Sequence, residues 1–93
     1  LLTHVRKGSI LKVHSLMRGN LELLELEVRD KENSKTIGKN LEQINTPENT
    51  IMCCIIRDEI IIFDMTNILL EKSDRLVCLV NKKDVKQIEE LFE

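Results

Sequence analysis

The sequence predicts an α+β domain: a small, mostly antiparallel sheet with a short helix after the first strand and a helix at the C-terminus. Three observations predict this class. Apolar and acidic residues alternate over residues 24–28, two β-branched runs flank an acidic pair at positions 58 and 59, and apolar residues recur at helical spacing over residues 84–93. The 93 residues provide for one hydrophobic core, so we expect a single domain.

The first predicted strand spans residues 21–28. Its alternate side chains are apolar on one face and acidic on the other, namely Leu24, Leu26 and Val28 against Glu25 and Glu27. This alternation is typical of a strand that is buried on one side. The doubled leucine at positions 23 and 24 breaks the alternation, which indicates either a β-bulge or a strand covered at one end.

A short helix is expected after a polar loop over residues 29–35. Ile37, Leu41 and Ile44 lie at positions i, i+4 and i+7, which places them on one face of a helix. Pro47 follows and cannot continue the helix, so the spacing predicts a helix of about two turns.

The most apolar part of the chain predicts a β-hairpin. Residues 51–57 and 60–63 are largely β-branched and are joined by Asp58 and Glu59. The pair lacks the glycine that primed hairpin turns prefer, so the sequence leaves the register open.

The last two elements are a strand over residues 75–80 and a helix over residues 84–93. In the helix, Val85 and Ile88 share a stripe with either Leu91 or Phe92, and the charged residues lie outside it. The expected order after the first strand is therefore short helix, hairpin, strand and helix.

The composition argues against a nucleic-acid-binding protein. The chain has 14 basic and 16 acidic residues, a formal net charge of −2 and only 2% aromatic residues. It has no surplus of positive charge to displace counterions from a phosphate backbone, and few rings to stack on bases. We expect no nucleic acid among its partners.

No motif for catalysis, metal binding or phosphate binding is visible in the sequence. A zinc site needs about four converging ligands, but His4 and His14 lie far from Cys53, Cys54 and Cys78, and no Cys-x-x-Cys pair occurs. Ser15 beside His14 is adjacency in sequence rather than a catalytic geometry. We expect no enzyme and no metal, with the cysteines as small core residues in a reducing cytosol.

The sequence has no signal peptide and no segment that spans a membrane. Its longest apolar run, residues 51–56, is far shorter than the roughly 20 residues that a spanning helix needs. We expect a soluble chain that still serves a membrane protein, and, because it begins at Leu1, a fragment of a longer protein.

Arg57 is the charged residue with the most suggestive position, because it ends an otherwise apolar strand beside the acidic turn. One interpretation is an arginine at the rim of the sheet that pairs with Asp58, Glu59 or a neighbouring strand. The other is a guanidinium at the edge of an apolar dimer groove that holds a phosphate with two hydrogen bonds.

Several short motifs occur in an order that resembles a known family. They are Ile37-Gly38-Lys39, Pro47, the apolar run 51–57 ending in Arg57, the run 60–63, Leu70, and Ser73-Asp74 before residues 75–80. The opening motifs at residues 4–8, 13–16 and 19–22 belong to the same pattern. Together they resemble the C-terminal (RCK-C or TrkA-C) subdomain of TrkA-type regulators of potassium conductance. Ser73 stands where this family usually has glycine.

This resemblance implies a regulatory and dimerisation domain of a Trk-type potassium uptake system. The domain would be cytoplasmic, peripheral to the inner face of the cell membrane, and would control a TrkH-like membrane channel subunit through subunit rearrangement. Residues 1–19 would be the connection from a preceding nucleotide-binding subdomain, and residues 20–93 the TrkA-C domain. NAD or ATP would belong to that absent subdomain, so we expect no cofactor here.

Two site hypotheses follow for the apolar hairpin. Two apolar strands would leave an exposed patch in a monomer, and a homodimer would bury it; we expect Ile56, Ile60 and Ile62 at that interface. The rival hypothesis is a sensor that binds a cyclic dinucleotide or nucleotide in the dimer groove at Ile55, Arg57 and Ile61. A nucleotide panel in calorimetric titrations separates the two.

Overall fold

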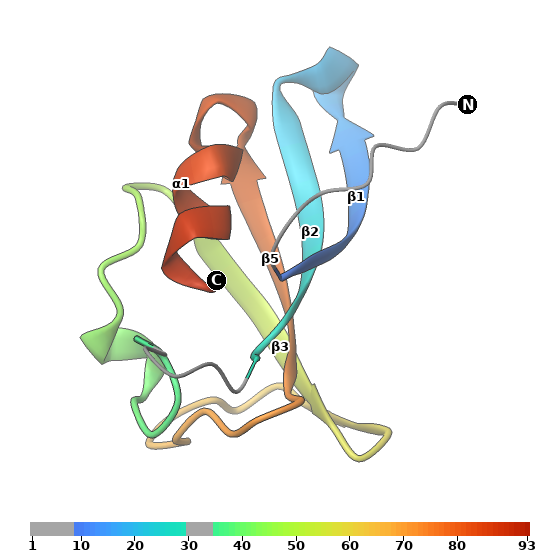
Figure 1. The fold of residues 1–93 in the computed structure, drawn as a ribbon. Helices are drawn as coiled ribbons and strands as arrows, with labels where there is room; N and C mark the ends of the chain where they lie inside the picture. The colour runs from blue at the N-terminus through green and yellow to red at the C-terminus, as the bar shows by residue number, and fades with distance from the viewer. Residues whose placement is uncertain (1–8, 30–34) are drawn as a thin grey trace.

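The computed structural model describes residues 9–29 and 35–93, which form one five-stranded antiparallel sheet with a helix on one face (Figure 1). The strands lie in the order β1-β2-β5-β3-β4. They are β1 (Ile10–Leu16), β2 (Leu21–Glu27), β3 (Ile51–Arg57), β4 (Ile60–Ile62) and β5 (Arg75–Asn81), and the helix is α1 (Val85–Leu91). Three 3-10 turns complete the fold, at Met17–Gly19, Leu41–Gln43 and Lys82–Asp84. The predicted fold class is confirmed.

Strand β2 shows the predicted alternation. Leu24, Leu26 and Val28 are fully buried on the side of the helix, and Glu25 and Glu27 lie on the opposite face. The register against β5 is unbroken from Leu21 to Glu27, so the doubled leucine marks no bulge in β2.

The alternation continues through the doubled leucine because Glu22 takes an inward position. Glu22 is buried, and one of its carboxylate oxygens accepts a hydrogen bond from the Ser15 hydroxyl at 2.9 Å. Leu23 therefore lies on the opposite face. The register shift that does occur in this part of the sheet lies in β1, between Ile10 and Lys12.

The predicted short helix over residues 37–44 is wrong: the structure has only the 3-10 turn Leu41–Gln43. Gly38, at φ +81°, lies outside the helical region, and its N–H donates to the carbonyl of Leu70 at 2.8 Å. The Leu70 N–H donates to the carbonyl of Lys39, so the backbone of this segment bonds to the loop before β5 and not within a helix. A helix of two turns has too few internal bonds to compete with these contacts. Ile44 still packs into the core.

The predicted hairpin is present as β3 and β4, with Arg57 paired with Ile60. Asp58 and Glu59 have φ values of +51° and +66°, the left-handed values of a type I′ turn. The turn that the right-handed twist of the strands favours therefore forms without glycine.

The hydrophobic core lies between the sheet and α1. The helix contributes Val85 and Ile88, and the next turn of chain contributes Phe92, which is buried while Leu91 is only partly so. The apolar side chains of the long loops pack on the same side: Ile37, Leu41, Ile44, Met65, Ile68 and Leu70. Helix and loops thus cover one face of the sheet.

Residues 10–16, which we expected in the connection from a preceding subdomain, form strand β1 of the same sheet. Residues 1–8 of that connection lie outside the described residues. The boundary at residue 19 stays a prediction, although the paired hairpin of β1 and β2 spans it.

Replacing Ser73 with glycine is expected to raise the free energy of unfolding by about 1 kcal/mol. Ser73 has a φ of +73°, where a Cβ atom is strained, and its N–H bond to the Val28 carbonyl at 2.8 Å holds it there. Urea denaturation followed by circular dichroism measures the change. Ser73→Ala keeps the Cβ atom and serves as control; an equal gain in that variant would contradict the backbone explanation.

Candidate functional site

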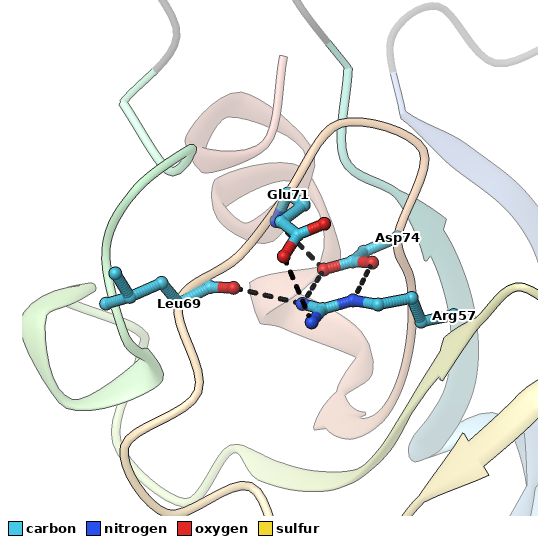
Figure 2. Close-up of polar contacts among 4 residues, drawn as sticks. All are labelled: Arg57, Leu69, Glu71 and Asp74. Atoms are coloured by element: carbon cyan, nitrogen blue, oxygen red, sulfur yellow. Dashed lines mark hydrogen bonds and ion pairs between the residues drawn. The ribbon is translucent and has the colours of Figure 1, made fainter.

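Arg57 stands at the end of β3, where it holds the long loop that leads into β5 (Figure 2). Its Nε donates to Oδ1 of Asp74 at 2.8 Å, and its Nη2 donates to Oδ2 at 2.7 Å. The same Nη2 donates to the carbonyl of Leu69 at 3.0 Å, and Nη1 lies 3.2 Å from Oε2 of Glu71. We call these four residues, Arg57, Leu69, Glu71 and Asp74, the arginine clamp.

The arginine clamp is anchored on its buried side. Asp74 is only 1% exposed, and its Oδ2 also accepts the backbone N–H of Glu71 at 2.9 Å. The Asp74 backbone extends the connection, because its carbonyl accepts the Val28 N–H at 2.7 Å. One side-chain pair therefore joins the ends of β2 and β3 to the start of β5.

The electrostatics of the clamp favour a permanently charged Arg57. Its pKa lies above its usual value, chiefly because of the hydrogen bond to Asp74, with further support from the charges of Asp74 and Glu71. Glu71 is a weaker partner, since its side chain is 64% exposed and solvent screens its interaction.

Of the two interpretations of Arg57, the structure shows an arginine paired with a residue just before the neighbouring strand, Asp74. The bidentate edge of the guanidinium, Nε and Nη2, is occupied by this carboxylate. A phosphate could take that edge only by displacing a buried aspartate.

The second feature is the face of the sheet opposite α1. Directly paired residues of antiparallel strands project to the same side. Leu24 pairs with Cys78 on the helix side, so the next pairs, Leu23 with Leu79 and Leu79 with Ile51, lie on the other side. We call this surface the open face; its apolar residues are Leu16, Leu21, Leu23, Ile51, Cys54, Ile56, Ile61, Val77 and Leu79.

The open face is apolar around Leu23, Leu79 and Ile51 and remains partly exposed, and the polar side chain of His14 lies on the same face beside Leu23. Ile51 is 55% exposed, and Ile56, Leu23, Val77 and Leu79 are half-buried. Among residues 9–29 and 35–93, the side chains of the loops and helix that join the core do so on the other face. No second layer of the described residues therefore covers the side chains of the open face.

Charged side chains border the open face at one end. Arg75 Nη1 lies 3.2 Å from Glu25 Oε2, and Lys12 Nζ lies 4.0 Å from Glu25 Oε1. Arg75 Nη2 also lies 3.7 Å from Glu59. Opposite charges are therefore paired along this border of the open face.

The structure divides the residues of both site hypotheses between two faces. Ile56 pairs with Ile61 on the open face. Ile60 and Ile62, expected at the dimer interface, lie on the helix side together with Ile55, which is fully buried in the core. The three residues expected to bind a ligand, Ile55, Arg57 and Ile61, therefore share no common surface in one copy, and their role stays a prediction.

Three residues of the two features, Asp74, Leu23 and Leu79, were not expected as site residues from the sequence. Leu23 and Leu79 carried a usable signal, because apolar residues on both sides of a strand indicate two covered faces. Asp74 was named only within the motif Ser73-Asp74, and its pairing with Arg57 was not expected because 17 residues separate the two.

The structure shows no metal centre in its described part. Residues 9–29 and 35–93 contain no group of three or more His, Cys, Asp or Glu side chains suited to an ion, and His4 lies outside those ranges. Burial, with a contribution from Cys53, raises the pKa of the Cys78 thiol to about 12, so this thiol stays protonated. Cys54 is also buried, and its pKa is raised mainly by burial.

The fold and the two features define a small α+β domain that presents an apolar sheet face and holds its loop with a buried ion pair. The TrkA-C domain model matches residues 26–93. The chain belongs to the TrkA-C domain family. This family is regulatory and non-enzymatic, so the prediction of a non-enzyme is confirmed by membership.

Full-length relatives have the same kind of C-terminal region. The chain is 38% identical over 95 residues to the Trk system potassium uptake protein TrkA of Vibrio alginolyticus, and 33% identical over 95 residues to that of Halomonas elongata. Each alignment covers 100% of this chain and 21% of the relative. The chain therefore spans about a fifth of the length of these relatives.

None of the helices in the described residues has the length and apolar character to cross a membrane.

Proposed function

We propose that this chain is the regulatory and dimerisation domain of a Trk-type potassium uptake system. Membership of the TrkA-C family and the names of the relatives, Trk system potassium uptake proteins, support the assignment to potassium uptake. In this proposal the domain lies in the cytoplasm, against the inner face of the membrane, and its partner is a TrkH-like channel subunit bound through the parent protein.

The open face is the observation that supports dimerisation. The surface is built from half-exposed leucine, isoleucine and valine side chains. Covering it with a matching surface removes apolar area from water, which lowers the free energy of the pair. Two copies related by a twofold axis present the same patch to each other, and aligned sheet faces pack well. A change in the angle between such copies is a simple way to transmit a signal to a channel.

A pair of matched substitutions tests which face is used. Ile51→Asp places a charge on the open face and is expected to convert the dimer to a monomer, because a buried unpaired carboxylate is costly. Ile60→Asp is the control: Ile60 is 63% exposed, similar to the 55% of Ile51, but lies on the helix side. Light scattering after size-exclusion chromatography measures the mass. Dissociation by Ile60→Asp and not by Ile51→Asp would contradict the open-face interface.

A further inference from the structure

The two edge strands of the sheet, β1 and β4, lie in segments whose charged residues have opposite sign. The strand order leaves both strands with one unpaired side among the residues that the structure describes. Residues 9–20, which contain β1, include Lys12, His14 and Arg18 and have no carboxylate. We call this strand and its turn the basic edge.

The acidic edge comprises residues 58–64, which contain β4. It carries Asp58, Glu59 and Asp64 and has no basic residue. The ion pairs that offset these charges among the described residues are long, and each has one exposed member: Glu59, 93% exposed, lies 3.7 Å from Arg75, and Lys12, 64% exposed, lies 4.0 Å from Glu25. Such contacts neutralise little of the field.

Strand β4 also offers backbone groups and apolar surface at its edge. In a hairpin with a two-residue turn, the pair next to the turn, Arg57 with Ile60, exchanges both backbone hydrogen bonds. The N–H and C=O of Ile61 therefore point away from β3, toward the free edge. Ile60 and Ile61 are both exposed, as are Leu11 and Leu16 on β1. Unpaired backbone groups beside exposed apolar side chains can pair with another strand, and the three residues of β4 limit that pairing to a short stretch.

We propose that the basic edge of one copy pairs with the acidic edge of a second copy, so that β1 and β4 join two sheets through backbone hydrogen bonds. Pairing of two acidic edges or of two basic edges places like charges together, which leaves the mixed contact as the favoured one. The contact joins different surfaces of the two copies and is therefore head-to-tail. It uses the edges of the sheet and does not depend on the open-face dimer.

Charge-swapped variants test the edge contact. Every charge variant is made in the Ile51→Asp chain, which removes the open-face contact. Association through the edges is then measured separately from the open-face dimer. Sedimentation velocity over a concentration series is expected to show association at about 20 mM salt and its loss at about 500 mM, where screening shortens the range of charges to a few Å. Lys12→Glu and Glu59→Lys should each weaken association by about tenfold. The double variant, which carries both substitutions, should regain it.

A second pair of variants tests the strand itself. Ile61→Pro removes the outward N–H, while Ile61→Ala removes a similar part of the side chain and keeps the N–H. Loss of association in the proline variant alone supports strand pairing, with circular dichroism as the check of folding. If the proline variant fails to fold, the charge-swapped set decides. A chain that stays monomeric at low salt, a double variant that does not regain association, or equal loss in both Ile61 variants overturns the proposal.

Discussion

Replacing Arg57 with alanine is expected to lower the free energy of unfolding by about 3–5 kcal/mol. The substitution removes two of the three hydrogen bonds to the carboxylate of Asp74, which is only 1% exposed, and leaves only the bond from the Glu71 N–H. It also frees the Leu69 carbonyl and the loop between β4 and β5. Domains of this size are stable by about 5–15 kcal/mol in total, so the loss is a large share of it. Urea denaturation followed by circular dichroism measures the change.

Two further variants separate the parts of the arginine clamp. Glu71→Gln removes the exposed partner and should cost no more than about 1 kcal/mol. Arg57→Lys keeps the positive charge but loses the planar fork that engages Asp74, so its cost should lie between the other two. If Arg57→Ala costs no more than Glu71→Gln, the buried pair does not hold the loop.

Replacing Phe92 with alanine is expected to cost about 3–5 kcal/mol. Phe92 is the largest of the fully buried side chains, and its backbone N–H donates to the Ile88 carbonyl at 3.2 Å at the end of α1. Its ring lies in the core cluster between helix and sheet, so truncation leaves a cavity. Thermal unfolding of the variant reports the loss.

Leu91→Ala is the matched control, because Leu91 precedes Phe92 in the chain and is only partly buried. Its truncation removes fewer packing contacts and should cost clearly less. A larger cost at Leu91 than at Phe92 would show that the helix docks in another orientation.

The strands were predictable where local pattern alone determines burial. The alternation around Leu24 and Leu26 predicted β2, and the β-branched runs predicted β3 and β4. The prediction of a strand over residues 75–80 matches β5 within one residue. β1 was missed because the register shift between Ile10 and Lys12 breaks the alternation: Ile10 and Val13 face the helix side, three positions apart. The period of two that identifies a strand is absent there.

The site was less predictable because it depends on contacts between distant segments. The sequence singled out Arg57 but not Asp74, which the loop brings to it from 17 positions away. The false helix at residues 37–44 has the same origin, since the carbonyl of Leu70 takes the backbone bond of Gly38. Which hairpin residues lie on which face depends on the register of the turn. The sequence did not determine that register, because Asp58 and Glu59 lack the glycine that identifies a turn type.

The mass of the chain in solution tests the open-face dimer most directly. Size-exclusion chromatography with light scattering at high micromolar concentration, in about 0.5 M salt, screens the charged edges and leaves the apolar contact. Pairing through the open face predicts twice the 10.8 kDa of one copy. A single species of 10.8 kDa across the concentration range would contradict it.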